Sequence, residues 1–406
     1  MLYHALALAR TGASVSVVGG AGSDIRREIS AEPRISWHIL SALTSTARPA
    51  GANVWFAPAA VIKACRVSIQ LARVLLWQLP RFDVLLVQNP PAIPTLLIAI
   101  IAARVRGARL VIDWHNLGHA MLALRLGEAH PLVRIARWHE YRAAHLASSH
   151  LCVSQAMRAR LHEEIGIDAA VSLDRPAEFF RPTPRADRIA LFERLVRTQA
   201  LPSDLLAAAH GDASRPAIVV TATSWTADED LPLLIDAARA WEARRLSGGS
   251  VDRWPRLRIL ITGRGPLREA FDAAVARLHL VHVSLHTLWL EPDDYPRLLG
   301  ACDLGVSLHR SASGVDLPMK IADMFGAGLP VCALDYGATL AEQLQPGVNG
   351  LLFTTADELA EQWDRLFADQ SGAWPRLDTL RQPVSQAASW RWNDEWQAHA
   401  KPLLVS

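Results

Sequence analysis

The chain has 406 residues, of which half are hydrophobic and a fifth are charged, so its composition excludes a disordered chain and predicts a globular protein with more than one apolar core. The formal net charge of +2 provides no field that favours nucleic acid as a partner. The four cysteines form no Cys-x-x-Cys or Cys/His ligand spacing, which argues against a disulfide framework and a zinc site.

The N-terminal sequence MLYHALALARTGASV lacks the basic start, apolar run and small-residue cleavage site of a signal peptide. The longest apolar run, residues 92–103, is too short to cross a bilayer and predicts a buried helix. Together with the isolated cysteines, these features predict a cytoplasmic protein.

Residues 59–79 alternate basic and apolar side chains at helical spacing. This pattern fits a helix that lies on an anionic lipid surface. It also fits an ordinary amphipathic helix packed on a sheet, and the pattern alone leaves both open.

Short runs rich in β-branched residues alternate with helical patterns along the chain, which predicts parallel sheets covered by helices on both faces. The predicted strands lie within residues 14–20, 83–91, 109–116, 149–157, 217–225, 258–265, 303–310 and 330–337. Polar residues or glycine follow nearly every strand. Because ligands of open α/β sheets bind at the carboxyl ends of the strands, these residues are candidates for a site.

The strand rhythm stops between Arg181 and Ala217, where a helical pattern is followed by Pro, Gly, Asp and Ser. We therefore expect a first domain over residues 1–185 and a linker over 186–215. A second domain is expected over residues 216–380, followed by a terminal helix over 381–406.

Residues 223–230, TSWTADED, include three consecutive acids that could be interpreted as metal ligands. Thr226 and Glu229, however, have capping-box spacing, and acids in a first helical turn suit the helix dipole. Capping needs no further ligands, so we expect no cofactor and no metal in the chemistry.

Residues 261–269, ITGRGPLRE, predict a strand that ends in a glycine turn. Gly263 and Gly265 would let the backbone approach a ligand closely, and Arg264 or Arg268 could contact a phosphate bidentately. The same motif is also common in tight strand-to-helix turns without a ligand.

Residues 313–323, SGVDLPMKIAD, predict a turn whose backbone N–H groups face an anion, followed by a helix that directs its positive end at a diphosphate. Lys320, in the first helical turn, would neutralise charge that develops on a departing diphosphate. Asp323 could accept hydrogen bonds from a ribose diol. The alternative is an exposed helix on which Lys320 and Asp323 form a surface ion pair.

Several long segments together resemble the β-1,4-mannosyltransferases that add the first mannose to chitobiosyl-diphosphodolichol, glycosyltransferase family 33. They keep their order and spacing over the whole chain. The segments are residues 111–140, 151–158, 221–237, 261–269, 289–333 and 389–396.

The resemblance implies an α/β fold of GT-B type, with two facing Rossmann-like domains and a C-terminal helix that returns toward the N-terminal domain. It implies GDP-mannose as donor, a lipid-linked N-acetylglucosamine acceptor, inversion to a β-1,4 linkage, and peripheral attachment to the cytoplasmic face of a membrane. The expected donor-binding residues are Ser224, Trp225, Gly263, Arg264, Gly265, His309, Ser313, Gly314, Asp316, Lys320 and Asp323.

Inversion requires a base that deprotonates the acceptor hydroxyl while the bond to GDP breaks. Asp113 and His115 point to the same side of an extended segment, so either could be that base or orient it. Glu140 is the next candidate. Alternatively, Asp113 and His115 form a fixed pair that shapes the loop.

The family normally has a membrane anchor, a strand and a Gly/Arg loop before the helix that here reads MLYHALALA. The chain begins at that helix, so we expect the first strand of the N-terminal domain to be missing. Two other functions therefore stay open: a GT-B enzyme with another nucleotide sugar or acceptor, and a non-catalytic nucleotide-sugar-binding protein.

Overall fold

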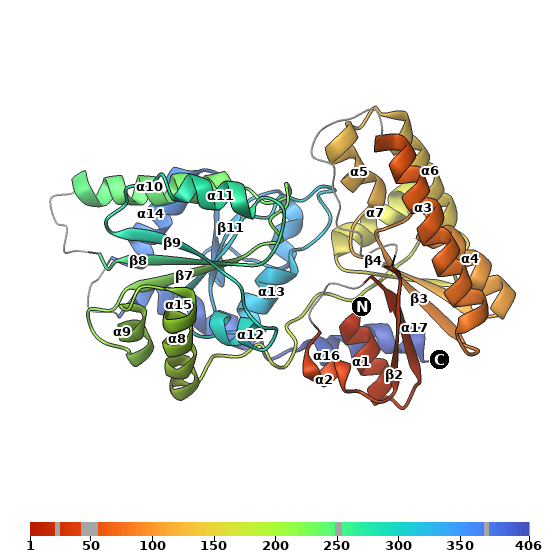
Figure 1. The fold of residues 1–406 in the computed structure, drawn as a ribbon, viewed down its shortest axis with the longest axis horizontal. Coiled ribbons are helices and arrows are strands. Elements are labelled where there is room, and N and C mark those ends of the chain that lie inside the picture. Colours follow the sequence, from red (N-terminus) through yellow and green to blue (C-terminus); the bar gives the residue numbers. More distant parts are fainter. Residues whose placement is uncertain (21–24, 42–55, 248–253, 369–372, 406) are drawn as a thin grey trace. The chain divides into compact units, whose positions relative to one another are not determined.

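The computed structural model describes residues 1–20, 25–41, 56–247, 254–368 and 373–405 (Figure 1). The chain divides into two compact units. The first unit comprises Met1–Leu173 and Asn393–Ser406, and the second unit comprises Asp174–Trp392. Each unit contains its own parallel sheet.

The first unit contains a four-stranded parallel sheet in the order β3-β4-β5-β6 and a two-stranded parallel pair, β1-β2. In the β3–β4 pair, Gln88 lies opposite Asp113. The strands in the described part of this unit are β1 (Val15–Gly19), β2 (Ile35–Ile39), β3 (Val84–Asn89), β4 (Arg109–Trp114), β5 (Ser149–Cys152) and β6 (Ala170–Val171).

Local signals in the sequence set several helix ends of the first unit. Gly107 and Gly166 end α4 and α7 in the left-handed conformation that favours glycine. The Ser154 hydroxyl caps α7 by accepting the Met157 N–H. The helices of this part of the chain are α1 (Leu2–Arg10), α2 (Arg27–Ser30), α3 (Phe56–Arg73) with the π-helical turn η2 (Val74–Gln78), α4 (Thr95–Arg106), α5 (Gly118–Leu126), α6 (Pro131–Ala144) and α7 (Gln155–Ile165).

The C-terminal residues form a nearly continuous helix that belongs to the first unit from Asn393 onward. Its parts are α16 (Trp392–Glu395), a π-helical turn η5 (Trp396–Ala400) and α17 (Lys401–Leu404). The Glu395 carboxylate accepts the Leu173 N–H at 3.0 Å, and Trp396 is fully buried. The expected return of the C-terminal helix to the N-terminal domain is present from Asn393 onward, whereas residues 381–392 of the expected terminal helix lie in the second unit.

The second unit contains a six-stranded parallel sheet in the order β12-β11-β10-β7-β8-β9. Because successive strands extend from β7 toward one edge and from β10 toward the other, the topological switch point lies between β7 and β10. The strands are β7 (Ala217–Ala222), β8 (Leu257–Thr262), β9 (Val283–Leu288), β10 (Leu304–Ser307), β11 (Val331–Leu334) and β12 (Gly350–Phe353).

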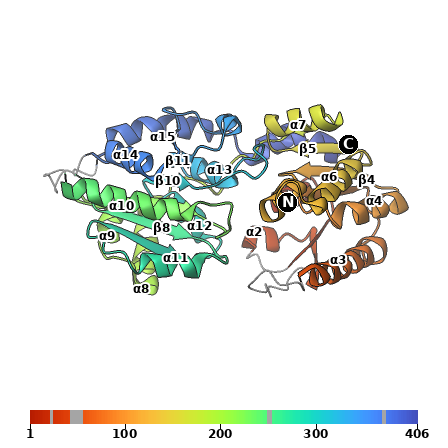
Figure 2. The same cartoon turned by 90° about the horizontal axis from the view of Figure 1, so that it is seen from above.

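Helices cover both faces of this sheet, with α10, α11 and α14 on one face and α8, α9 and α12 on the other (Figure 1). Helices α14 and α15 pack against one another, which is also visible from above (Figure 2). The helices are α8 (Arg185–Gln199), α9 (Leu205–His210), α10 (Leu231–Ser247), α11 (Arg268–Val275), α12 (Asp294–Leu299), α13 (Met319–Gly326), the 3-10 turn η4 (Ala338–Glu342), α14 (Ala356–Leu366) and α15 (Pro375–Ala387).

All eight predicted strands form, whereas β2, β6, β9 and β12 were not predicted. Residues 186–215, expected as a linker, contain α8 and α9 and lie in the second unit. The apolar run at 92–103 does form a helix, α4, but full burial is wrong because Leu97 and Ile101 are 49% and 43% exposed. No helix in the described ranges is long and apolar enough to cross a membrane.

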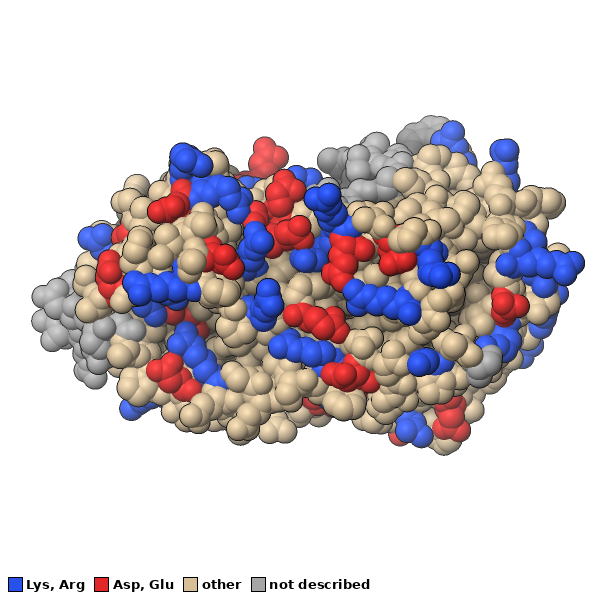
Figure 3. Space-filling model, turned by 90° about the horizontal axis from the view of Figure 1, so that it is seen from below, with Lys and Arg blue, Asp and Glu red and all other residues tan. Residues whose placement is uncertain are grey.

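Charged side chains of both signs lie interspersed on the face of the molecule seen in Figure 3. This mixture of acidic and basic side chains agrees with the small net charge of the chain. Nothing on that face resembles the continuous basic stripe of a nucleic-acid-binding protein.

Candidate functional site

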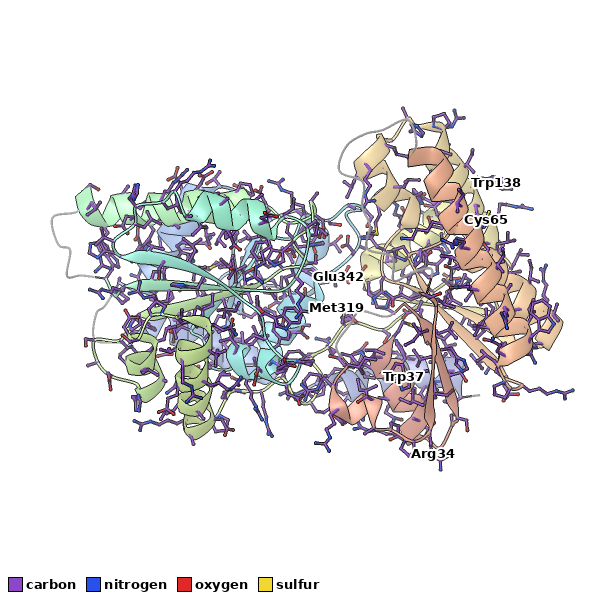
Figure 4. The ribbon with its side chains drawn as sticks, in the orientation of Figure 1. Arg34, Trp37, Cys65, Trp138, Met319 and Glu342 are labelled. Carbon is purple, nitrogen blue, oxygen red and sulfur yellow. The ribbon has the colours of Figure 1, made fainter. Side chains whose placement is uncertain are left out.

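The loops that follow β7 and β10 join at the switch point of the second unit. Asp230 donates its N–H to the Leu308 carbonyl at 3.0 Å, and Arg310 donates its N–H to the Asp228 carbonyl at 2.7 Å. Glu229 and His309 face each other in an isolated antiparallel bridge. These contacts fix the loop at residues 223–230 to the loop that leads from β10 to α13. Figure 4 labels Met319, the first residue of that helix.

Lys320 lies in the first turn of α13, and its ammonium forms an ion pair with the Glu229 carboxylate. The two side chains are 16% and 3% exposed. The Thr223 hydroxyl donates to the same carboxylate and accepts the Trp225 N–H at 2.8 Å. The structure thus places a cation, at the positive end of a helix, at the carboxyl end of the sheet.

Burial lowers the pKa of Lys320 to about 8, against the charge of Asp228, which raises it. The contact with the Glu229 carboxylate also favours the ammonium form. The alternative of an exposed Lys320–Asp323 surface pair is wrong, since Lys320 is largely buried and pairs with Glu229.

Glu229 pairs with Lys320, and the sequence analysis did not name it as a site candidate. Its capping-box spacing with Thr226 predicted a helix cap, but its carboxylate is buried against Lys320 and Thr223. Its position in the sequence could have identified it. Glu229 lies in the loop after β7, a central strand of the sheet, and the other candidates also follow strands.

Asp316 organises the loop between β10 and α13. Its carboxylate accepts from Ser311, from Ser313 at 3.2 Å and from His309 at 2.9 Å. Burial raises the pKa of Asp316, but the hydrogen bonds from His309 and Ser311 and the charge of His309 lower it below its ordinary value. His309, Ser313 and Asp316 are therefore brought together as one cluster, and Gly314 follows in the left-handed conformation, φ 74°.

Asp323 lies on α13 and accepts from the Tyr295 hydroxyl at 3.5 Å. The residue as a whole is partly buried. Burial of the carboxyl group, and then the charge of Asp174, raise the pKa of Asp323 to about 8. At neutral pH this side chain is mainly a protonated carboxylic acid, which can both donate and accept hydrogen bonds.

The glycine turn after β8 packs directly on the turn after β7. A Cβ atom at Gly263 would lie 1.8 Å from the Thr223 carbonyl oxygen, and one at Gly265 would lie 1.9 Å from the Ser224 carbonyl oxygen. Gly263 also has φ 133°, which favours glycine. The two glycines are needed for the contact between the two turns. The sequence analysis predicted instead that they would let the backbone approach a ligand.

The side chains around this turn differ in their access to a ligand. Trp225 is fully buried in the core of the second unit, where its ring meets Phe271 edge-on at 5.3 Å. The Arg264 guanidinium stacks on the Trp289 ring, 3.3 Å from its centroid. Ser224 is exposed, and its hydroxyl lies 2.7 Å from that of Thr226.

In the first unit, Asp113 and His115 form a pair at the end of β4. His115 Nε2 lies 2.9 Å from Asp113 Oδ2, and His4 Nε2 from α1 lies 3.5 Å from the same oxygen. Burial raises the pKa of Asp113, but the charge of His115 and hydrogen bonds from both histidines lower it well below its ordinary value. The expected proximity of Asp113 and His115 is present in the structure.

Glu140 holds the start of α5. Its fully buried carboxylate accepts from Asn89 Nδ2 at 2.5 Å, from the Gly118 and His119 N–H groups at 2.8 and 3.2 Å, and from His119 Nδ1 at 2.6 Å. Burial raises the pKa of Glu140, and these hydrogen bonds lower it below its ordinary value. With four donors and no exposed surface, this carboxylate has the environment of a structural residue.

Within the described ranges, no group of three or more His, Cys, Asp and Glu side chains is arranged to hold a metal ion. Among the predicted donor residues, His309, Ser313 and Asp316 lie together after β10. The Arg264 side chain lies against Trp289, and the Trp225 side chain lies in the core.

Comparison with known families gives two matches. Residues 2–173 match the glycosyl transferase 4-like domain, and residues 215–369 match the glycosyl transferases group 1. These ranges correspond to the body of the first unit and to most of the second unit.

The chain is also similar to curated proteins over its full length. It is 38% identical to the chitobiosyldiphosphodolichol beta-mannosyltransferase of Mus musculus, with 100% of this chain and 86% of the relative covered. It is 36% identical to the protein of the same name from Kluyveromyces lactis, with the same coverage. The UDP-glycosyltransferase TURAN of Arabidopsis thaliana is 37% identical, with 100% and 94% covered.

Solved structures share the fold at low sequence identity. An OtsA apo structure matches with a TM-score of 0.60 at 13% identity, covering 98% of this chain and 94% of that chain. A UDP-forming α,α-trehalose-phosphate synthase from Burkholderia xenovorans matches with a TM-score of 0.58 at 11% identity, covering 97% and 100%. The predicted GT-B fold class, with a parallel sheet in each of two Rossmann-like halves, is confirmed.

Proposed function

This chain belongs to the chitobiosyldiphosphodolichol β-mannosyltransferase family and is a glycosyltransferase, and we propose that it transfers mannose from GDP-mannose to a lipid-linked, N-acetylglucosamine-containing diphosphate acceptor. The transfer inverts the anomeric centre and forms a β-1,4 linkage. The observation that carries the proposal is the buried Lys320 ammonium at the first turn of α13, beside the switch point of a parallel sheet.

On the donor side, the diphosphate of GDP-mannose takes the place of Glu229 as the partner of Lys320. The positive end of α13 adds to the attraction, since helix N-termini bind phosphate groups. As the bond to mannose breaks, Lys320 stabilises the charge that develops on the leaving GDP.

The remaining proposed donor contacts are polar groups around Lys320. Asp323 binds the ribose hydroxyls, and Ser224, His309, Ser313 and the Gly314 backbone contact the rest of the nucleotide sugar. Gly263, Gly265, Asp316 and Trp225 hold the loops in place, which their contacts within the protein support.

On the acceptor side, the base is Asp113 or His115 in the first unit. The base removes the proton of the acceptor hydroxyl, whose oxygen forms a bond to the anomeric carbon while the carbon–oxygen bond to GDP breaks. The electron pair of that bond leaves with the diphosphate. Glu140 is not assigned this role, because its carboxylate is buried and already accepts from four donors.

The membrane is a proposed partner through the outer faces of α3, α4 and α6. Trp77 after α3, Val105 of α4 and Trp138 of α6 are 73%, 68% and 66% exposed. Helix α4 contacts both α3 and α6, and Figure 4 labels Cys65 on α3 and Trp138 on α6. Exposed basic residues lie on the same helices: Lys63, Arg66, Arg73, Arg104, Arg134, Arg137 and Arg142.

Apolar side chains interleaved with cations suit the interface of an anionic bilayer. Helices α3 and α4 contain no acidic residue, and the one acid of α6, Glu140, is fully buried. A surface of this composition would keep the first unit next to a lipid-linked acceptor, which supports peripheral attachment to a membrane.

The proposed donor is tested by ligand-observed NMR with GDP-mannose, GDP, UDP-glucose and UDP-N-acetylglucosamine. We expect GDP-mannose and GDP to bind and the UDP sugars not to bind. Binding of the UDP sugars instead would overturn the mannose assignment, an outcome made relevant by the name of the Arabidopsis relative. Failure of all four ligands to bind would contradict the donor site itself.

A further inference from the structure

We infer that His115 is the base of the proposed reaction and that His4 and Trp396 are positioning residues, which hold the Asp113 carboxylate against His115. This inference rests on the proposed function, and it resolves the alternative between Asp113 and His115. It also gives the C-terminal helix a role in the chemistry of the first unit.

The protonation of His4 follows from its contact with Trp396. The Trp396 indole Nε1 lies 3.1 Å from His4 Nδ1, and both residues are buried. An indole N–H can only donate, so His4 Nδ1 must accept. The proton of a neutral His4 therefore lies on Nε2, and double protonation of this ring would break the contact with Trp396.

The Nε2 atom of His4 in turn lies 3.5 Å from Asp113 Oδ2. His115 Nε2 lies 2.9 Å from the same oxygen. Two ring nitrogens from separate parts of the first unit thus contact one oxygen of the Asp113 carboxylate. The Asp113 side chain is 4% exposed. Of the two contacts the one to His115 is shorter, and His4 contacts the same oxygen from α1.

This environment makes Asp113 a poor proton acceptor. Burial raises the pKa of Asp113, but its interactions with His115 and then with His4 lower that pKa well below its ordinary value. A carboxylate that stays ionised suits a different task, which is to orient an imidazole and to stabilise the imidazolium that forms. The His115 side chain is 18% exposed, against 4% for Asp113, so a substrate has better access to His115.

The proton balance of the step is then complete. His115 donates its Nε2–H to Asp113, so the neutral ring carries its lone pair on Nδ1. The acceptor hydroxyl transfers its proton to Nδ1, its oxygen bonds to the anomeric carbon, and GDP leaves with the electron pair. The resulting imidazolium faces the Asp113 carboxylate.

The positioning role is tested by Trp396→Phe, which removes the indole N–H and keeps an aromatic ring. Trp363→Phe is the matched control, because Trp363 is also fully buried but its Nε1 has no hydrogen-bond partner in the described part of the chain. We expect Trp396→Phe to lower kcat about two- to tenfold, the effect of one net hydrogen bond, with an unchanged donor KM. Trp363→Phe should leave kcat unchanged. Equal kcat in both variants would overturn the positioning role.

The tautomer is measured without substrate, from the imidazole nitrogen-15 chemical shifts of labelled protein. We expect His4 to carry its proton on Nε2 in the wild-type chain and to populate both tautomers in Trp396→Phe. A proton on Nδ1 in the wild-type chain would reject the inference even if the enzyme is active. Absence of transfer by the wild-type chain would reject the proposed function and leave the tautomer result intact.

The choice of base is tested by His115→Gln and Asp113→Asn. Both variants keep a polar side chain of similar size, and neither residue is proposed to contact the donor. We expect His115→Gln to abolish transfer and Asp113→Asn to reduce it while leaving measurable turnover. The reverse pattern, with turnover retained in His115→Gln and lost in Asp113→Asn, would make Asp113 the base.

Discussion

Lys320 is one of three lysines in a chain whose other 39 strongly basic residues are arginines, and it is the one that pairs with Glu229. Lys320→Ala should lower kcat about 100- to 1,000-fold, because a charge-stabilising group at the leaving diphosphate is lost. The free energy of unfolding should also fall by about 3–5 kcal/mol, because the Glu229 carboxylate stays buried without its cation. Steady-state kinetics and urea denaturation measure the two effects.

The double variant Lys320→Met with Glu229→Gln separates stability from catalysis. It removes both charges, so much of the stability lost in Lys320→Ala should return. Transfer should remain as low as in Lys320→Ala. Near-normal transfer in either variant would contradict the role assigned to Lys320.

Asp323 gives the protein a pH-dependent stability. Since the pKa of Asp323 in the folded protein is raised to about 8, the folded state holds a proton that the unfolded state releases at about pH 4. The contribution of this group to stability is present below about pH 4 and is lost as the pH rises to about 8. Asp323→Asn does not titrate, so its melting temperature relative to wild type should increase from pH 5 to pH 8.

Asp236→Asn, at a side chain that is 58% exposed, is the control for this experiment. It should show no comparable trend with pH. A difference between Asp323→Asn and wild type that stays constant over the range would show that Asp323 is ionised in the folded protein at neutral pH.

Residue-scale prediction from the sequence succeeds where a local pattern carries the information. Lys320 was placed correctly at a helix start after a strand, because the turn, the proline and the lysine are neighbours in sequence. Glu229 was assigned to a cap for the same reason, since its partner Lys320 lies 91 residues away. A contact of that length leaves no trace in local spacing.

At the level of elements, the contact between the turns after β7 and β8 makes a sharp prediction. Gly263→Ala should destabilise the second unit and weaken nucleotide binding, because its Cβ would lie 1.8 Å from a backbone oxygen and its φ disfavours alanine. Gly19→Ala is the control, since nothing lies within 4 Å of a Cβ there and its φ is ordinary. Thermal unfolding and nucleotide titration test both. Equal stability in the two variants would show that the turns do not pack as described.

Helix α5 depends on Glu140, and this dependence separates a scaffold from a base. Glu140→Gln replaces one of the two acceptor oxygens by an NH2 group, which cannot accept a hydrogen bond. The N–H group that faced that oxygen, from Gly118 on Oε1 or from His119 on Oε2, is then left without its acceptor. Stability should fall by about 1–3 kcal/mol, the cost of leaving a buried donor unsatisfied. The kcat of the folded enzyme should stay close to wild type. A large loss of kcat at unchanged stability would return Glu140 to the list of bases.

Several of the predicted strands, such as β7 and β8, are almost entirely buried. The missed strand β9, Val283–Leu288, mixes Ser, His and Thr with apolar residues, because its faces are unequally buried at the sheet edge. For α4 the sequence predicted an apolar helix. Whether each of its apolar side chains is exposed depends on which other helices and strands pack against α4. Such tertiary information is outside the reach of periodicity.

At the scale of the whole molecule, the exposed apolar and basic face of the first unit predicts binding to lipid. Co-sedimentation with vesicles that contain anionic lipid should be reduced by Val105→Glu and by Trp138→Glu, both of which place an acid on that face. Val281→Glu, at a side chain that is 70% exposed in the second unit, is the matched control and should bind like wild type. Equal binding of all variants would place the membrane contact elsewhere.

The two ends of the chain contact each other in the first unit, where Trp396 lies next to His4, 392 residues away in sequence. The two-unit organisation could be predicted because each half repeats the strand–helix rhythm. The contact between the chain ends could not, because it depends on the path of the C-terminal helix. The resemblance to known proteins supplied that path, and residue spacing did not.

The central claim is best tested by transfer from radiolabelled GDP-mannose to a synthetic chitobiosyl-diphospho-lipid by the purified chain, followed by β-mannosidase digestion of the product. We expect one mannose per acceptor, released by the β-specific enzyme. Transfer from a UDP sugar instead, or a product that resists β-mannosidase, would contradict the proposed reaction.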